Sequence, residues 1–267
     1  MVLSPQKQTI EHRHFYQLDE YLMDGDVLIF NDTRVIPARL IGVRQPTGGK
    51  AEVFLLRQLE RDRWEVLVKP GKKMRVGSVI TFGHELSCEV LAHTDFGGRI
   101  VKFSYEGIFE EILDRLGTMP LPPYIHETLE DPERYQTIYS REKGSAAAPT
   151  AGLHFTESLM DRLRKKGVRL GFVTLHVGLG TFRPVQVDEI EDHVMHSEFY
   201  SIPTETADLI RMAKQEGRRV VAVGTTSIRT LESAAVDHGM IEEKRGQTNI
   251  FIYPGYQFKI VDAVITN

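Results

Sequence analysis

The sequence predicts an α/β protein into which a small all-β unit is inserted, and two observations support this fold class. Between Val35 and Tyr105, short apolar runs alternate with turn residues about every ten positions, as in a small barrel or sandwich. After Thr156, helical patterns alternate with apolar strands, which favours mostly parallel strands covered by helices. We therefore expect a large α/β body formed by residues 1–36 and 106–267, and a small β domain at residues 37–105.

Six strands are expected in the β domain, because turn clusters separate six apolar runs. One of these turns carries Lys69, Lys72, Lys73 and Arg75. It either contacts phosphate or is a solvated hairpin, since lysines are common in exposed turns. The six expected strands are 35–44, 51–60, 63–71, 77–82, 86–93 and 99–107.

The body is expected to contain strands that alternate with capped helices. Residues 26–30 (DVLIF) form a strand that can join the larger sheet. The next helix stops at Gly117, and a later one begins at a Thr156 N-cap and ends before Gly167. We expect helices at 107–117, 156–167, 203–217 and 225–235, strands at 168–178 and 218–224, and two further strands within 249–267.

Composition limits the class of protein. The chain has 267 residues and 41% hydrophobic residues, and it lacks an apolar run long enough to cross a membrane. Its start turns polar within a few residues, unlike a signal peptide. Cys88 is the only cysteine, which suits a reducing cytoplasm. The net charge of −4 means that any nucleic-acid contact must rest on local basic patches.

Hydroxyl residues follow the strand that ends at Val223. Gly224 is followed by Thr225, Thr226 and Ser227 at a helix start, where free N–H groups and the helix dipole favour an anion or a polar ligand. Simple N-capping by Thr226 or Ser227 is the alternative interpretation. Arg229 either serves a ligand or pairs with Glu232 three positions on.

Histidines gather after the strand that ends near residue 178. His176 points to the same face as Thr174, and the glycines that follow clear space beside it. His193, His196 and Glu198 could hold a metal ion with His176, but no cysteine supports such a site. The pattern therefore favours acid/base chemistry or substrate binding. The glycines at 178 and 180 do not form a dinucleotide loop, because position 183 is arginine and a proline follows it.

The stretch SAAAPTAGLHFT, Ser145 to Thr156, has no acidic, lysine or arginine side chain. It is either buried packing or a surface against which a ligand lies, and small side chains would let a ligand approach the backbone. His154 stands just before the helix that starts at Thr156. A helix N-terminus disfavours a charged imidazole, so we expect a neutral, hydrogen-bonding histidine there.

Eight motifs occur in an order that resembles a known family. They are NDTRVIPARL, MPLPPYI, RYQTIYS, GSAAAPTAGLHFT, TLHVGLGTFRPV, MHSEFY, VGTTSIRTLE and IFIYPGYQFKIVDAVITN. Over nearly its whole length the chain resembles the S-adenosylmethionine:tRNA ribosyltransferase-isomerases of queuosine biosynthesis. The resemblance implies an α/β-barrel-like body with an inserted small six-stranded β-barrel. It also implies transfer of the ribosyl part of S-adenosylmethionine to 7-aminomethyl-7-deazaguanine at the wobble position of tRNA, which yields epoxyqueuosine-tRNA, adenine and methionine.

The implied chemistry needs proton transfer, a carboxylate clamp and surfaces for sugar and base. With the resemblance, we interpret Ser145 to Thr156 as a wall whose small side chains let the ligand approach the backbone closely. S-adenosylmethionine is a consumed substrate, no metal is expected, and tRNA is the partner of a protein expected to be a monomer. A non-catalytic tRNA-binding module is the alternative. Family members extend beyond both ends of this chain, so we expect an exposed sheet edge where such elements are missing. The catalytic candidates are His154, His176, His193, His196 and Glu198; the substrate-binding candidates are Asp32, Arg34, Ser145, Thr150, Thr156, Arg183, Thr225, Thr226, Ser227 and Arg229.

Overall fold

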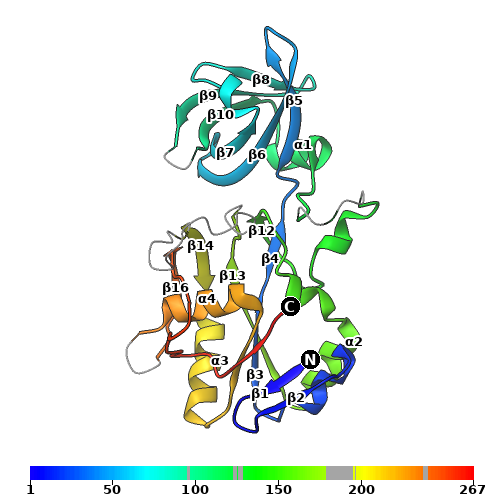
Figure 1. Cartoon of the computed structure of the whole chain (residues 1–267), viewed down its shortest axis with the longest axis vertical. Coiled ribbons are helices and arrows are strands. Elements are labelled where there is room, and N and C mark those ends of the chain that lie inside the picture. The colour runs from blue at the N-terminus through cyan, green and yellow to red at the C-terminus, as the bar shows by residue number, and fades with distance from the viewer. Residues whose placement is uncertain (95–96, 123–124, 126–128, 179–194, 196, 237–239) are drawn as a thin grey trace.

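The protein has two parts, a β-barrel above and an α/β body below in the view of Figure 1. The computed structural model describes residues 1–267 except 95–96, 123–124, 126–128, 179–194, 196 and 237–239. The chain leaves the body after its first long strands, builds the barrel, and returns to complete the body. None of the helices in the described part is long and apolar enough to cross a membrane.

The barrel is antiparallel throughout. Its six strands form a closed barrel because β5 also pairs with β8, the strand at the far end of the sheet. The neighbours around it follow the order β5, β6, β7, β10, β9, β8. Alternate residues point inward and fill the interior, as the two-fold sequence pattern predicts. All six expected strands are confirmed: β5 (Arg39–Gln45), β6 (Gly49–Glu60), β7 (Arg63–Lys69), β8 (Val79–Phe82), β9 (Leu86–His93) and β10 (Arg99–Tyr105).

The body is built on a six-stranded sheet in the order β16-β14-β13-β3-β15-β17. The four strands from β13 to β17 in this order run parallel, whereas β14 and β16 are antiparallel to their neighbours. Among the described strands this sheet is open, and the α/β class with an inserted six-stranded barrel is confirmed. The bounds are β3 (Val27–Asn31), β13 (Arg169–Leu175), β14 (Glu198–Ile202), β15 (Val220–Val223), β16 (Lys244–Thr248) and β17 (Ala263–Ile265).

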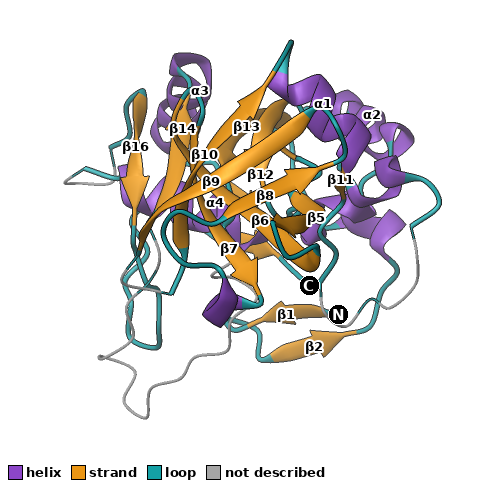
Figure 2. Ribbon diagram, turned by 90° about the horizontal axis from the view of Figure 1, so that it is seen from above, coloured by secondary structure: helices purple, strands orange, loops and turns teal. Residues whose placement is uncertain are grey.

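Helices cover both faces of the body sheet. Helices α3 and α4 pack in one apolar cluster, and α2 packs in another on the opposite face; Figure 2 shows α3 and α2 on opposite sides of the molecule. Thr156 caps α2 as predicted, and α1 packs into the barrel core rather than onto this sheet. The helices are α1 (Phe109–Leu116), α2 (Glu157–Lys165), α3 (Thr204–Gln215) and α4 (Gly224–Ala234).

Strand β3 lies inside this sandwich and is buried along its whole length. Val27 and Ile29 pack with α3 and α4, whereas Leu28 and Phe30 pack with α2. A strand buried on both faces reads as a continuous apolar run, which is why DVLIF is such a clear signal. Functional side chains can therefore follow β3 at the carboxyl edge of the sheet.

Two extended segments join the barrel to the body. Strand β4 (Thr33–Val35) leads up and pairs in parallel with β12 (Glu142–Ser145), while β11 (Gly117–Thr118) leads back and pairs with β5. A side chain at Gly117 would place its Cβ 2.1 Å from the carbonyl oxygen of Pro37. Glycine is thus required where the two connections cross. A separate two-stranded sheet is formed by β1 (Val2–Ser4) and β2 (Thr9–Glu11).

The C-terminal region differs from the expectation. We expected two strands within 249–267, but only β17 forms there, and β16 lies before the segment. Residues 258–261 instead wrap around Glu232, whose carboxylate accepts the backbone N–H groups of Lys259, Ile260 and Val261. These three N–H groups are bound to the carboxylate and are therefore not donated to a strand partner.

Candidate active site

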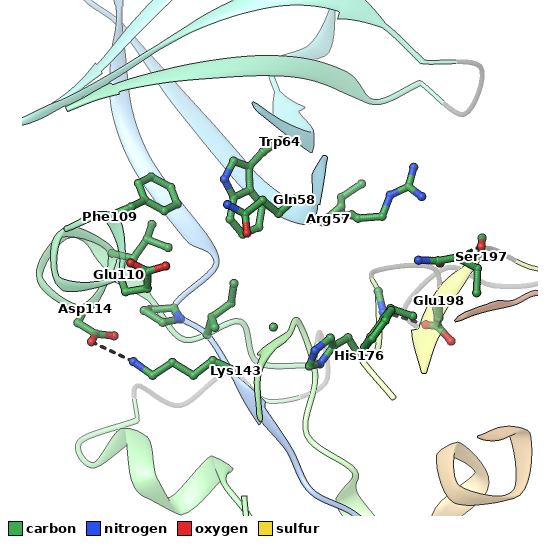
Figure 3. Close-up of a pocket in the computed structure, with 18 residues that line it drawn as sticks. Arg57, Gln58, Trp64, Phe109, Glu110, Asp114, Lys143, His176, Ser197 and Glu198 are labelled. Carbon is green, nitrogen blue, oxygen red and sulfur yellow. Dashed lines mark hydrogen bonds and ion pairs between the residues drawn. The ribbon is translucent and has the colours of Figure 1, made fainter. Parts of the chain in front are cut away.

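A cavity of about 320 Å³ lies between the barrel and the body (Figure 3). Its size is at the low end of the range for small-molecule sites. The barrel and α1 form one wall and the ends of the body strands form the other. The lining residues used below are Arg57, Gln58, Trp64, Phe109 and Asp114 from the barrel side, and Lys143, Gly144, His176, Gly178, Ser197 and Glu198 from the body side.

His176 follows β13 and borders this cavity. Its Nδ1 lies 2.8 Å from the Thr33 hydroxyl, and its ring stacks on Phe199 with centroids 5.6 Å apart. A Cβ on Gly144 would lie 2.8 Å from Nε2, so a glycine is needed to leave room for the ring. Burial lowers the pKa of His176, and the charge of Asp32 opposes that shift. The lowered pKa favours the neutral imidazole of His176 at pH 7.

Glu198 is buried beside the same cavity at the start of β14. Its carboxylate accepts the Gly178 N–H at 2.8 Å and pairs with the Arg229 guanidinium. The sequence alternative of an Arg229–Glu232 pair is wrong, because Glu232 is engaged by the C-terminal backbone. Arg229 also donates to the carbonyl of Ile250, and its Nη2 has no partner in the described part of the chain.

Three polar residues that we predicted to bind substrate instead form hydrogen bonds or ion pairs between the segments around the cavity. Asp32 accepts from Thr174 at 2.8 Å and pairs with Arg141. Arg34 donates to Ser140 and pairs with Glu133. The Ser145 hydroxyl donates to the carbonyl of Ala147 and accepts the N–H of Val177 at 3.0 Å. Asp32, Arg34 and Ser145 therefore hold the walls in place and lie outside the lining itself.

The loop at residues 145–156, which has no acidic, lysine or arginine side chain, is mainly buried in the packing of the body. Ala146, Ala147, Ala148 and Ala151 are all buried, and a Cβ on Gly152 would clash with the Tyr139 hydroxyl at 2.1 Å. This placement supports the packing interpretation over a wall against which a ligand lies.

The polar residues of this loop face other partners. Thr150 accepts from the Asn267 amide, and Thr156 caps α2. His154 is exposed and packs against Phe15, with ring centroids 5.1 Å apart. None of these three residues is among those that line the cavity.

The start of α4 presents backbone and hydroxyl groups at the end of β15. Gly224 has a positive φ of 82°, which lets the chain turn sharply from strand to helix. The Ser227 hydroxyl donates to the carbonyl of Val223, so it does not cap the helix. Thr225 is exposed, and the buried Thr226 hydroxyl has no partner in the described residues. These residues lie outside the cavity lining.

Arg183, His193 and His196 lie outside the described residues. In the described part of the chain, no group of three histidine, cysteine or carboxylate residues could hold a metal ion.

His176 and Glu198, which were predicted as site residues, lie at the cavity. Thr33, Lys143 and Trp64 were not predicted. Thr33 stands in NDTR at the end of a strand, which is a usable signal. Trp64 fits the two-fold pattern of a core strand, so nothing marked it as a cavity residue.

Comparison with known proteins points to one family. The family model described as "Queuosine biosynthesis protein" matches residues 1–267. The chain is also similar to the S-adenosylmethionine tRNA ribosyltransferase of Thermotoga maritima, known from a crystal structure. The two are 36% identical over 98% of this chain and 74% of that one, with a TM-score of 0.46.

Proposed function

Because this chain belongs to the family of queuosine biosynthesis proteins, we propose that it is an S-adenosylmethionine-dependent tRNA ribosyltransferase-isomerase. Family membership makes it a tRNA-modifying enzyme of queuosine biosynthesis. The finer proposal is the reaction. The ribosyl part of S-adenosylmethionine joins the aminomethyl group of 7-aminomethyl-7-deazaguanine at the wobble position, and adenine and methionine leave.

The observation that carries the proposal is a neutral His176 fixed by Thr33 at the edge of the interdomain cavity. The sulfonium of S-adenosylmethionine acidifies the adjacent ribose carbon, so a base can remove a proton and start ring opening with loss of adenine. The substrate amine is then deprotonated and attacks the opened sugar. Methionine departs when a ribose oxygen closes the epoxide. An unprotonated imidazole suits the first of these proton transfers.

The other charged groups at the cavity have separate roles in this proposal. Glu198 and Arg229 are committed to each other, and they position the end of β13 through the Gly178 N–H. Lys143 and Arg57 border the cavity, and Lys143 is paired only loosely with Asp114 at 3.5 Å. Arg57 is paired with Glu65 at 3.2 Å, so the loosely paired Lys143 is the better candidate to bind the methionine carboxylate.

A basic turn of the barrel supports tRNA as the partner. Arg99 is buried and donates to the carbonyls of Gly71 and Met74, which fixes the turn between them. Lys72 and Lys73 project from this turn and form no ion pair within the described part of the chain. Fixed, unpaired cations suit phosphate contacts. A cytoplasmic location belongs to the same proposal, and the monomeric state stays a prediction.

The test is to mix the protein with S-adenosylmethionine and tRNA that carries the deazaguanine precursor, and to quantify free adenine and methionine. We expect both products in equal amounts, and only when the precursor base is present. The matched control is the same tRNA with ordinary guanine. Salt-sensitive binding of both RNAs without product would overturn the enzymatic proposal and favour the non-catalytic tRNA-binding alternative.

A further inference from the structure

The barrel wall of the cavity is aromatic, although nothing in a barrel core requires aromatic rings to face a cleft. Trp64 of β7 and Phe109 of α1 lie with ring centroids 5.7 Å apart, and both line the cavity. Figure 3 shows Trp64, Gln58 and Phe109 on the barrel side of the cavity, across from His176 and Lys143 on the body side. The inserted barrel and α1 thus supply two aromatic rings, tilted by 39° to each other, to the barrel side of the cavity.

Trp64 also carries an unused hydrogen-bond donor. The residue is 8% exposed, and its indole N–H has no partner among the described residues. Buried indole N–H groups usually find an acceptor, because an unpaired buried donor is costly.

The opposite wall is aromatic as well. His176 lies nearly parallel to Phe199, with 24° between the ring planes. Charged side chains border the same cavity, among them Arg57, Lys143 and Asp114. A cavity with aromatic surfaces on both walls, one spare N–H donor and charges around it suits a planar heterocycle attached to a charged group.

We propose that the inserted barrel binds the purine-type ring system of a substrate against Trp64 and Phe109, while the body performs the chemistry. This inference rests on the proposed function, which supplies two such rings. One is the adenine of S-adenosylmethionine and the other is the deazaguanine of the tRNA. Both have flat faces and an in-plane acceptor, so the chemistry of recognition is shared.

Trp64 is the only tryptophan in the chain, so its fluorescence reports on this wall alone. We would titrate the protein separately with S-adenosylmethionine, with adenosine, and with an anticodon stem–loop that carries the deazaguanine. Stacking should quench the emission to saturation for the source that occupies the wall. Free tryptophan amide at equal absorbance controls for light absorbed by the ligand. Quenching by the first two ligands identifies adenine, and quenching by the stem–loop alone identifies the tRNA base.

Three variants make the test independent of folding. Trp64→Ala should weaken binding of the quenching ligand about 10-fold to 100-fold by calorimetry, and Trp64→Phe should retain most of the affinity, in line with base–aromatic stacking. Phe82→Leu changes the same barrel core away from the cavity, so it should leave affinity unchanged.

Unchanged fluorescence with all three ligands, in a protein that turns over, would overturn this inference and leave the proposed function standing. Equal affinities for Trp64→Ala and wild type would also overturn it. A protein that releases no adenine and methionine would instead count against the proposed function.

Discussion

At the scale of single residues, the decisive contact is between Thr33 and His176. The Thr33 hydroxyl lies 2.8 Å from Nδ1 and 3.5 Å from the carbonyl oxygen of Glu142. The proposed base requires the Nδ1–H tautomer, in which Nδ1–H donates to the Thr33 hydroxyl and that hydroxyl points toward the carbonyl, which only accepts. In this tautomer Nε2 is unprotonated. Thr33 is therefore a positioning residue that sets the tautomer of His176.

Removal of the Thr33 hydroxyl should impair the base without unfolding the site. Thr33→Val keeps the shape of the side chain and loses the hydrogen bond. We expect kcat to fall about 10-fold to 100-fold, because the variant loses only part of the rate enhancement that a general base provides. KM should stay nearly unchanged. Thr33→Ser keeps the hydroxyl and should recover most of the activity. Nitrogen NMR of histidine-labelled protein should show the Nδ1–H tautomer in wild type and Thr33→Ser, and its loss in Thr33→Val.

The pH profile gives an independent measurement of the same contact. A protonated imidazole cannot accept a proton, and burial lowers the pKa of His176. The acid limb of kcat/KM should therefore lie below the ordinary histidine pKa of about 6.5. Identical tautomers and pH profiles in the valine and serine variants would contradict a positioning role for Thr33.

At the scale of elements, an ion pair between a buried carboxylate and a half-exposed arginine links the starts of two parallel strands. Asp26 precedes β3 and pairs with Arg219, which precedes β15 and also donates to the carbonyl of Tyr21. Burial raises the pKa of Asp26, but hydrogen bonds from Arg219 and the Met23 N–H outweigh it, and the pKa is lowered overall. The pair is therefore a stabilising link between β3 and β15 at neutral pH.

Asp26→Asn should lower the free energy of unfolding by about 1–3 kcal/mol at pH 7, the usual range for hydrogen bonds to charged groups. A lowered folded-state pKa means that this stabilisation is complete above the unfolded-state pKa of about 4 and is lost as the pH falls through the folded-state pKa. Urea unfolding at neutral and acidic pH should therefore show the difference from wild type shrinking in acid.

The matched control for this link is Asp161→Asn. Asp161 pairs with Arg164 on the exposed surface of α2, where such pairs contribute little. An equal loss of stability in both variants would contradict the special role of the Asp26–Arg219 pair.

The sequence allowed most elements to be predicted where one physical rule dominates. Alternation revealed the barrel strands, continuous burial revealed β3, and the Thr156 cap located α2. Strand β12 escaped prediction because its EKGS sequence lacks apolar residues, and only pairing with β4 makes it a strand. Strand β14 was not predicted, although EFYSI alternates between buried and half-buried residues. The histidines just before it were interpreted as ligands, and the alternation was overlooked.

At the scale of the whole molecule, the cavity depends on segments that are far apart in the chain. Trp64 belongs to the barrel, Lys143 to a short strand beside β4, and His176 to the end of β13. Each residue type was visible in the sequence, and His176 was identified from its local setting. The pairing of His176 with Thr33, 143 positions away, could not be predicted, because tertiary contacts determine it.

The insertion also gives the two parts different tasks. The body places His176, the proposed proton-transfer group, at the carboxyl edge of its sheet, where α/β proteins usually bind ligands. The barrel covers that edge with an aromatic wall, and Gly117 permits the close crossing of the two connections that join them. This division explains why the site is absent from either part alone.

The most direct test of this account is the transfer of label from S-adenosylmethionine carrying isotopic carbon in its ribose. Wild-type protein and His176→Gln would be incubated with precursor-bearing tRNA, and the label in the RNA would be measured by mass spectrometry. His93→Gln, an exposed barrel histidine outside the cavity, serves as the matched control. The account predicts full transfer by wild type and His93→Gln, and a loss of about 100-fold or more for His176→Gln. Equal transfer by His176→Gln and wild type would contradict it.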